Sequence, residues 1–130
     1  MTMPSPAGEL TFPPAVLDLL DAEEEVDIET TRANGAARTT IIWVVVEAGV
    51  AYVRSVRGPD GRWYQDVLAR PDATIVAAGQ RIAVRALPAA DAPSVEGCSI
   101  GLRTKYRADP SLQAMLAPAV LPTTLRLVPR

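Results

Sequence analysis

Residues 26–56 read VDIETTRANGAARTTIIWVVVEAGVAYVRSV, and this stretch decides the expected fold. Polar and apolar side chains alternate from Val26 to Arg32, which is typical of a strand with one solvated face. The Asn34-Gly35 pair is a strong hairpin signal, because both residue types tolerate a positive φ angle. Two further strands are expected from Thr39 to Glu47 and from Val50 to Val56. Together these segments predict an antiparallel meander of three strands.

The middle strand of this meander, Thr39 to Glu47, is apolar on both faces. A strand of that kind in so short a chain needs cover outside the sheet as well as inside it. A closed or split barrel, with helices or a second subunit packed against it, supplies that cover. The residues therefore predict a small, mainly β barrel with peripheral helices. The other strands are expected at 72–77, 80–87 and 123–128, and helices at 14–22, 62–69 (capped by Asp60), 94–106 and in a turn capped by Ser111.

The chain is expected to be a single domain, residues 1–130, with a flexible Pro-rich segment at residues 1–10. The N-terminus has no basic region followed by an apolar one, and the longest apolar run, Ile41 to Val46, has six residues. Neither a secretory signal nor a membrane span is therefore expected. A single cysteine also suits a reducing compartment, so these features predict a cytoplasmic location.

The composition excludes several kinds of catalytic and metal site. The chain has no histidine, so a Ser-His-Asp triad, a Cys-His pair and a His-ligated zinc are impossible. The single cysteine, Cys98, cannot form an intrachain disulfide or a CxxC metal site, and no metal is expected. No nearby base activates Cys98, so a buried thiol is favoured over a nucleophile. Any enzymatic activity is expected to depend on a cofactor or substrate that brings the reactive group.

Charge is unevenly distributed along the chain, although the net charge is only −2. Residues 1–31 hold eight of the 15 acids and no base, so the rest of the chain carries seven acids and all 13 bases. This acidic segment and the scarcity of aromatic residues argue against nucleic-acid binding. Twelve of the bases are arginine, whose planar fork of donors matches phosphate and carboxylate. Five of them lie within 31 residues, either as ordinary surface cations or as part of a site: Arg32, Arg38, Arg54, Arg57 and Arg62.

The segment with the most concentrated chemistry is YVRSVRGPDGRWY, residues 52–64. It places two arginines, a hydroxyl and flexible backbone N–H groups at a junction between a strand and a helix, which suits an oxyanion such as phosphate. Arg38, at the start of the neighbouring strand, is expected to join this cluster. A second interpretation is that Arg54 and Arg57 pair with carboxylates, while Trp63 and Tyr64 form the core face of a helix.

The run from Thr31 to Ala86, TRANGAARTTIIWVVVEAGVAYVRSVRGPDGRWYQDVLARPDATIVAAGQRIAVRA, resembles the flavin and deazaflavin split-barrel superfamily. Within it, the sequence looks most like the group called domain of unknown function 2255. The order of motifs is similar: a polar turn, an Arg before a strand that holds Ile-Trp, and then a YVRS-RG-WY block. The closing TLRLVP, residues 124–129, resembles the final strand of that group, and the similarity covers residues 26–130.

This resemblance implies a six-stranded antiparallel split barrel, commonly a homodimer with cofactor sites at the subunit interface. In related split barrels, FMN or an 8-hydroxy-5-deazaflavin coenzyme binds through a phosphate held by groups of the second and third strands. The cofactor-binding residues that the resemblance implies are Arg38, Thr39 and Thr40 on the second strand, Arg54, Ser55, Arg57 and Gly58 after the third, and Trp63 and Tyr64 on the helix that follows.

One departure from the superfamily concerns the LARPDATI run, residues 68–75. It resembles the Asn-Leu-x-x-Asn-Pro segment of deazaflavin-dependent nitroreductases, but Arg70 stands where that segment has Asn. The sequence also has no separate Lys cluster for a polyglutamate tail, so the choice between FMN and deazaflavin stays open. Two functions are compatible with the sequence. One is an oxidoreductase that passes a hydride to a small organic acceptor, and the other is a non-catalytic dimeric module that binds or stores a phosphorylated ligand.

Overall fold

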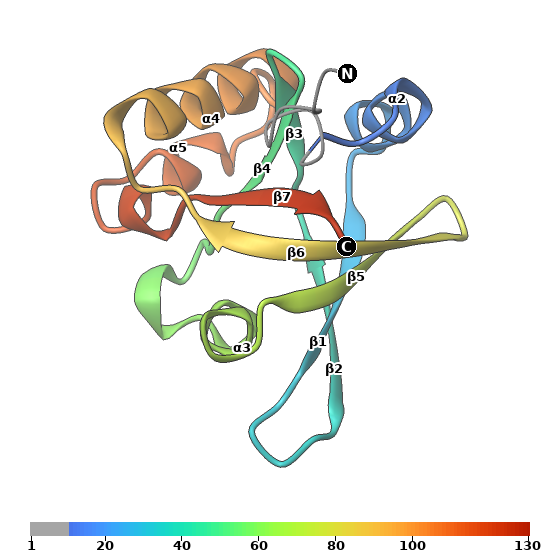
Figure 1. Ribbon diagram of the computed structural model, residues 1–130. Coiled ribbons are helices and arrows are strands. Elements are labelled where there is room, and N and C mark those ends of the chain that lie inside the picture. Colours follow the sequence, from blue (N-terminus) through green and yellow to red (C-terminus); the bar gives the residue numbers. More distant parts are fainter. Residues whose placement is uncertain (1–10) are drawn as a thin grey trace, which may run out of the picture.

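The computed structural model describes residues 11–130, and a single curved sheet with helices around it forms the molecule (Figure 1). The segment expected to be flexible, residues 1–10, lies outside the described residues. No helix within residues 11–130 is long and apolar enough to cross a membrane. In chain order the elements are α2 (Pro14–Ala22), β1 (Val26–Thr31), β2 (Ala37–Ile42), β3 (Val45–Glu47), β4 (Val50–Val53), the 3-10 helix η1 (Gly58–Asp60), α3 (Arg62–Ala69), β5 (Asp72–Ala77), β6 (Gln80–Pro88), α4 (Ala92–Lys105), α5 (Leu112–Met115), the 3-10 helix η2 (Leu121–Thr123) and β7 (Leu125–Pro129).

The sheet contains seven strands in the order β2-β1-β5-β6-β7-β4-β3, and every neighbouring pair is antiparallel. The expected β architecture with peripheral helices is therefore confirmed. There is one strand more than the six expected, because the segment from Thr39 to Glu47 is divided into β2 and β3. β2 pairs with β1 and β3 pairs with β4, so the two pieces lie at opposite edges of the sheet. The expected meander, in which one strand pairs with both neighbours, is wrong.

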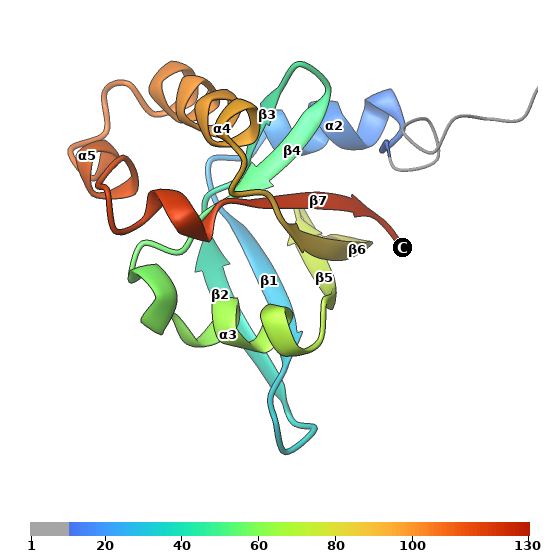
Figure 2. The same ribbon diagram turned by 60° about the vertical axis from the view of Figure 1, so that its left-hand side comes forward.

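The division falls at Trp43 and Val44, where side chains from the end of α4 replace a neighbouring strand. The Val44 carbonyl accepts a hydrogen bond of 2.7 Å from Nζ of Lys105, which also donates to the Leu20 carbonyl of α2 at 2.9 Å. The Trp43 ring stacks on the Tyr106 ring, with centroids 3.9 Å apart and planes 5° from parallel. The hydrogen bond from Lys105 satisfies the Val44 carbonyl where the chain leaves one edge of the sheet and joins the other (Figure 2).

The two faces of this divided segment pack into two different hydrophobic clusters, as its sequence predicts. Val44 lies in the barrel interior with Ile28 and Ile75. The next residue, Val45, packs on the opposite side, in a cluster that contains Leu102 of α4. Each buried Val contributes roughly 1.5–3 kcal/mol to folding. The helices α4 and α5 therefore provide the outer cover that a strand with two apolar faces requires.

Two expected helix caps are wrong, and one of the differences shapes the site. Asp60 does not cap α3, because it belongs to η1 and the residue before α3 is Gly61. A Cβ atom at Gly61 would overlap Oγ of Ser55, so a larger residue would force that hydroxyl out of its hydrogen bond to the Gly58 carbonyl. Ser111 precedes α5 but makes no side-chain cap hydrogen bond.

The helix α4 lies close to the sheet because glycines face it. Gly97 and Gly101 predict a weak helix, yet α4 runs for 14 residues, and Oδ2 of Asp91 accepts a hydrogen bond from the Ser94 N–H at its start. A Cβ atom added at Gly101 would lie 3.0 Å from the side chain of Val45 on β3. One added at Gly97 would lie 3.4 Å from the hydroxyl of Tyr52, which is an ordinary contact distance.

We expect Gly101→Ala and Gly97→Ala to have opposite effects on stability. Alanine favours a helix over glycine by about 1 kcal/mol, so Gly97→Ala should be neutral or stabilising. Gly101→Ala should destabilise by about 1–2 kcal/mol, since crowding against buried Val45 outweighs that gain. Urea unfolding of the two variants and the parent measures the difference. Equal stabilisation by both substitutions would show that β3 can shift away from α4 at no cost in stability, and would contradict the expected crowding at Val45.

Candidate functional site

A groove of about 840 Å³ lies where the sheet fails to close, between the free edge of β2 and the chain that leads from β4 into α3. Figure 2 shows η1 and α3 next to β2. Alternate backbone N–H and C=O groups of an edge strand point away from its single neighbour, so β2 offers them to this side. The residues that line the groove are Glu24, Glu25, Arg32, residues 37–43, Arg54, Ser55, Val56, Arg57, Gly61, Arg62, Trp63, Asp109, Ser111 and Met115.

The structure brings seven of the nine predicted site residues to this groove. The two that do not line it are Gly58, which is buried in the turn below, and Tyr64, which is half-buried against the core. All five arginines of the sequence cluster line the groove as well, including Arg32 and Arg62. The seven predicted residues that line it are Arg38, Thr39, Thr40, Arg54, Ser55, Arg57 and Trp63.

Arg38 is held in place by a buried carboxylate. Its Nε donates to Oδ2 of Asp66 on α3 at 2.8 Å, and the Thr30 hydroxyl donates to the same oxygen at 2.7 Å. Arg38 and Thr30 are directly opposite each other on β2 and β1, which places both side chains on the face that α3 covers. Within residues 11–130 the terminal nitrogens of Arg38 have no hydrogen-bond partner, so this end of the fork is available to a ligand in the groove.

Arg54 has a different role from the one expected, since protein oxygens occupy most of its donors. The side chain is only 2 % exposed. Nε donates to Oγ1 of Thr124 at 2.8 Å, and Nη1 donates to the Met115 carbonyl at 3.2 Å. Nη2 donates to the Val95 carbonyl at 2.7 Å and to Oγ of Ser99 at 3.0 Å. No carboxylate in the described chain forms an ion pair with it, and burial lowers its pKa.

Ser55 and Gly58 form a closed turn beneath the groove. The Ser55 hydroxyl donates to the Gly58 carbonyl at 2.7 Å, and the Gly58 N–H donates to the Ser55 carbonyl at 2.9 Å. The Ser55 N–H donates to Oγ1 of Thr123 at 3.0 Å. Gly58 has a φ of +68°, which favours glycine. This turn fixes the direction in which the chain leaves β4 and so presents Arg57 to the groove.

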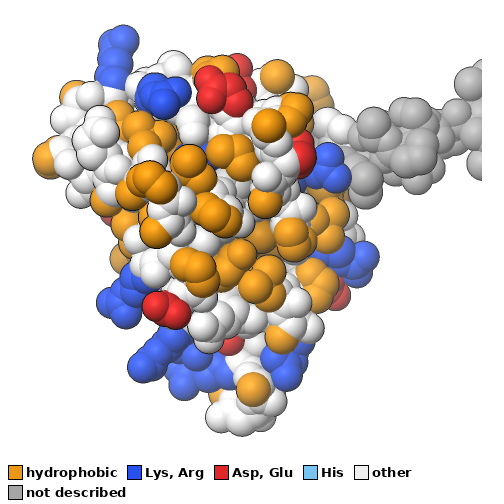
Figure 3. All heavy atoms as spheres, turned by 90° about the vertical axis from the view of Figure 1, so that its left-hand side faces the viewer, with side chains coloured by type: hydrophobic (Ala, Val, Ile, Leu, Met, Phe, Trp, Pro, Cys, Tyr) orange, Lys and Arg blue, Asp and Glu red, His pale blue; other side chains and the backbone are white. Residues whose placement is uncertain are grey.

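The remaining arginines of the groove are exposed, and their side chains have no partner within residues 11–130. These are Arg57 before η1, Arg62 at the start of α3 and Arg32 at the end of β1. Figure 3 shows Lys and Arg side chains gathered around the lower part of the face that holds α3 and η1. The expectation that Arg54 and Arg57 pair with carboxylates is wrong for the part of the chain that the structure describes.

The aromatic residues are divided between core and groove. Trp63 is 6 % exposed and belongs to the barrel core, but one part of it lines the groove. Tyr64 packs edge-on against Trp63, with ring centroids 6.3 Å apart. Trp43, which sequence reasoning did not place in the site, lines the groove at the bend and stacks on Tyr106. The sequence feature that could have indicated Trp43 is the Ile-Trp pair in a strand that is apolar on both faces.

Cys98 is a buried thiol and not a nucleophile of the groove. The side chain is 1 % exposed, and burial raises its pKa to about 11, although the positive charge of Arg54 opposes that shift. A thiol in this state is protonated at neutral pH and unreactive. The described arginine and threonine side chains of the groove can therefore bind an anion through guanidinium and hydroxyl groups.

A family model described as an uncharacterised protein conserved in bacteria, DUF2255, matches residues 16–127. The chain belongs to the DUF2255 family. A comparison with curated protein sequences gave no match. The DUF2255 chain is nevertheless similar in fold to many solved structures, at identities that show the fold alone.

Three of these structures illustrate the fold of the DUF2255 chain. The conserved hypothetical protein Rv2991 from Mycobacterium tuberculosis has a TM-score of 0.66 and 13 % identity over 99 % of this chain and 86 % of its own. A candidate pyridoxamine 5′-phosphate oxidase from Listeria innocua has a TM-score of 0.65 and 12 % identity over 89 % and 91 %. The heme storage protein HutZ from Vibrio cholerae has a TM-score of 0.60 and 13 % identity over 93 % and 92 %. The fold is thus the split barrel of pyridoxamine 5′-phosphate oxidase-like proteins.

We expect Arg54→Met to destabilise the DUF2255 protein by about 3 kcal/mol or more, because it leaves several buried oxygens without their charged donor. Arg57 lies only three residues after Arg54 but is exposed. Arg57→Ala should therefore change stability by less than about 0.5 kcal/mol. Chemical denaturation of both variants measures the contrast. Parental stability in Arg54→Met would contradict the structural role assigned to Arg54.

Proposed function

We propose that the groove binds a flavin-type cofactor, FMN or an 8-hydroxy-5-deazaflavin coenzyme. We further propose that the protein is an oxidoreductase that passes a hydride to a small organic acceptor. The observation that carries the proposal is a groove of about 840 Å³ at the opening of a split barrel, with arginines on its walls and two tryptophans facing it. A pocket of this size accommodates a cofactor with a fused ring and a phosphorylated chain.

The residues around the groove fit such a cofactor. Arg57 and the free end of the Arg38 fork offer donors for a phosphate, and the hydroxyl groups of Thr39 and Thr40 lie on the same strand edge. Arg54 and Ser55 support the wall through their internal hydrogen bonds. In this proposal they are positioning residues rather than direct ligands, as is Gly58.

The ring is proposed to lie against Trp63 or Trp43, with Tyr64 supporting Trp63 from behind. When bound, a flavin-type cofactor supplies the hydride chemistry. The protein's own residues bind and orient it and shield one side of the ring from water. The chain has no histidine, the side chain that most often serves as a general acid or base, which is consistent with a cofactor that carries the reaction.

The alternative function is a non-catalytic module that binds or stores a phosphorylated cofactor or ligand. The likeness in fold to HutZ, described as a heme storage protein, keeps a storage role in consideration. Histidine, the usual axial ligand in oxygen-binding heme proteins, is absent from this chain, so we do not extend heme storage to it. A reduction assay of the cofactor-loaded protein with quinones and nitroaromatics separates the two functions. Turnover supports the oxidoreductase, and binding without turnover supports the module.

Cofactor binding is expected to depend on Arg57. Titration of the parent protein with FMN and with the deazaflavin coenzyme should give saturable binding of one of them at tens of micromolar or below. Arg57→Ala should weaken that binding about ten- to hundredfold, because a charge-assisted bond to phosphate is lost. Arg103→Ala, an exposed arginine of α4 that does not line the groove, is the matched control. Failure of the parent to bind either cofactor would exclude the proposal.

We also propose that the protein is a homodimer whose interface closes the groove. Ile41 is 63 % exposed and Val56 is 57 % exposed, and both line the groove on either side of the opening. Figure 3 shows hydrophobic side chains spread over the middle of the face that holds α3 and η1. An exposed sheet edge beside such residues is a surface that natural proteins usually cover.

Ile41→Asp is expected to shift the protein from dimer to monomer, because it would bury a charge at the interface. Leu68→Asp, at an exposed apolar residue of α3 that does not line the groove, should leave the mass unchanged. Light scattering coupled to size-exclusion chromatography measures both. A monomeric parent protein at high micromolar concentration would rule out the proposed dimer.

A further inference from the structure

We infer that Lys105 is a covalent binding site for small neutral aldehydes, which it holds as an iminium in a second pocket. This pocket has a volume of about 460 Å³ and lies between the end of α2 and the end of α4. Lys105 is the only lysine of the chain, and it lines this pocket but not the groove. The inference goes beyond the proposed cofactor site and does not depend on it.

The amine of Lys105 is held so that one position on its nitrogen stays available. Nζ donates to the Val44 carbonyl at 2.7 Å and to the Leu20 carbonyl at 2.9 Å, and within residues 11–130 these are its only hydrogen bonds. An ammonium group has three N–H donors. Loss of one proton leaves a neutral amine with two N–H groups and a lone pair. The two carbonyls can then keep both N–H groups, and the lone pair is free to attack a molecule in the pocket.

Burial favours the neutral amine that this reaction needs. Lys105 is half-buried, and desolvation lowers its pKa, although the carboxylates of Asp21, Glu23 and Glu24 oppose that shift. Desolvated lysines are the ones that form Schiff bases in proteins. The Tyr106 ring lies 5.4 Å from Nζ, and burial raises the pKa of its hydroxyl, so it adds no negative charge near neutral pH.

The charges of the second pocket determine which electrophile fits. Its lining includes the carboxylates of Asp21, Glu24 and Asp109 and a single cation, Lys105. These carboxylates repel an anionic aldehyde such as glyoxylate and admit a neutral one. An iminium also keeps the positive charge on Nζ, whereas an acyl group would remove it and leave the carboxylates unopposed. The site therefore favours a neutral aldehyde over an acyl donor.

The reaction balances with the aldehyde as its only co-reactant. The lone pair of Nζ attacks the carbonyl carbon, and a C–N bond forms as the π electrons of the C=O bond move to oxygen. A proton passes from nitrogen to that oxygen and gives a carbinolamine. A second proton, supplied by water, lets the C–O bond break, so that oxygen leaves as water and a C=N bond forms. The adduct forms without an oxidant or reductant and is reversible.

An adduct at Lys105 acts on the bend between β2 and β3. The iminium nitrogen has one N–H group, so either the Val44 carbonyl at the bend or the Leu20 carbonyl of α2 loses its donor. The stacked rings of Trp43 and Tyr106 connect the two cavities, because Trp43 lines the groove and Tyr106 lines the second pocket. Occupation of the second pocket is thus linked to the edge of the groove.

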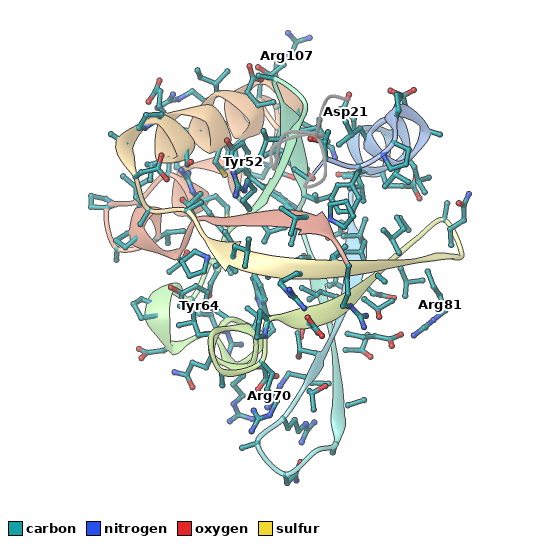
Figure 4. The ribbon with its side chains drawn as sticks, in the orientation of Figure 1. Asp21, Tyr52, Tyr64, Arg70, Arg81 and Arg107 are labelled. Carbon is teal, nitrogen blue, oxygen red and sulfur yellow. The ribbon has the colours of Figure 1, made fainter. Side chains whose placement is uncertain are left out.

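The test is reductive methylation of the full chain with formaldehyde and cyanoborohydride at pH 7, followed by peptide mass spectrometry. Cyanoborohydride delivers a hydride to an iminium and so converts each adduct into a stable amine. Arg107→Lys introduces an exposed reference lysine two residues along the chain. Arg107 lines neither cavity, and Figure 4 shows it at the top of the molecule. Lys105→Arg in the same background assigns the labelled peptide.

We expect Lys105 to react at least about threefold faster than the reference lysine in the native protein, because more of it is neutral. Lys105 should stop at one methyl group, since a secondary ammonium still has two N–H donors for its two carbonyls. The reference lysine should take two methyl groups. With glyoxylate as the aldehyde, Lys105 should react at least about threefold more slowly than the reference lysine, because the carboxylates repel it. In urea the two lysines should react alike with either aldehyde.

Three results would overturn the inference. If formaldehyde labels Lys105 only in urea, or more slowly than the reference lysine in the native protein, the two carbonyls hold an ammonium group that does not react. If glyoxylate labels Lys105 as readily as formaldehyde does, the pocket does not select neutral aldehydes. If Lys105 takes two methyl groups as readily as the reference lysine, it reacts only after leaving the carbonyls of Leu20 and Val44.

Discussion

Arg54 carries a positive charge into the interior, and the protein surrounds it with neutral oxygen atoms instead of a carboxylate. Burying a charge is expensive, and the hydrogen bonds that a cation forms with carbonyl and hydroxyl groups offset that cost only if their geometry is kept. The four acceptors come from α4, the end of α5 and the residue before β7. One guanidinium thus joins three separate segments to the end of β4. The wall from which Ser55 and Arg57 approach the groove depends on this junction.

The open edge of β2 depends on a second set of contacts, at the bend between β2 and β3. Lys105 bonds to the carbonyls of Leu20 and Val44, so it connects the end of α2 to the bend. Burial lowers the pKa of Lys105, while the carboxylates of Asp21, Glu23 and Glu24 oppose that shift. The hydroxyl of Tyr106 donates to the Glu24 carbonyl at 2.6 Å, and burial raises its pKa. Because the bend sends β3 to the far edge of the sheet, β2 keeps one unpaired side, and the groove forms there.

The sequence predicts the elements of this fold better than it predicts their pairing. The helix from Pro14 to Ala22, the hairpin at Asn34-Gly35 and the pair β5 and β6 follow from local signals, and the structure has them where expected. The bend at Trp43 and Val44 has no local signal, because apolar residues continue through it without a Gly or Pro. The side chain that bonds to the backbone at the bend is Lys105, 61 residues away. In the same way, an arginine in a motif indicates a charge, but only its packing shows that Arg54 bonds to the protein whereas Arg57 faces the groove.

The absence of histidine limits the acid-base chemistry that this chain can perform with its own side chains. Cys98 and Tyr106 do not line the groove, and burial keeps both protonated by raising the pKa of Cys98 to about 11 and by raising that of Tyr106 as well. Asp66 is bonded to Thr30 and Arg38, and Ser55 to the Gly58 carbonyl. The groove is lined by guanidinium groups, threonine hydroxyls and the backbone of an edge strand, with the carboxylates of Glu24 and Glu25 at one end. Such a set is better suited to binding anions than to transferring protons, which is why the proposed function leaves the reaction to the chemistry of a bound cofactor.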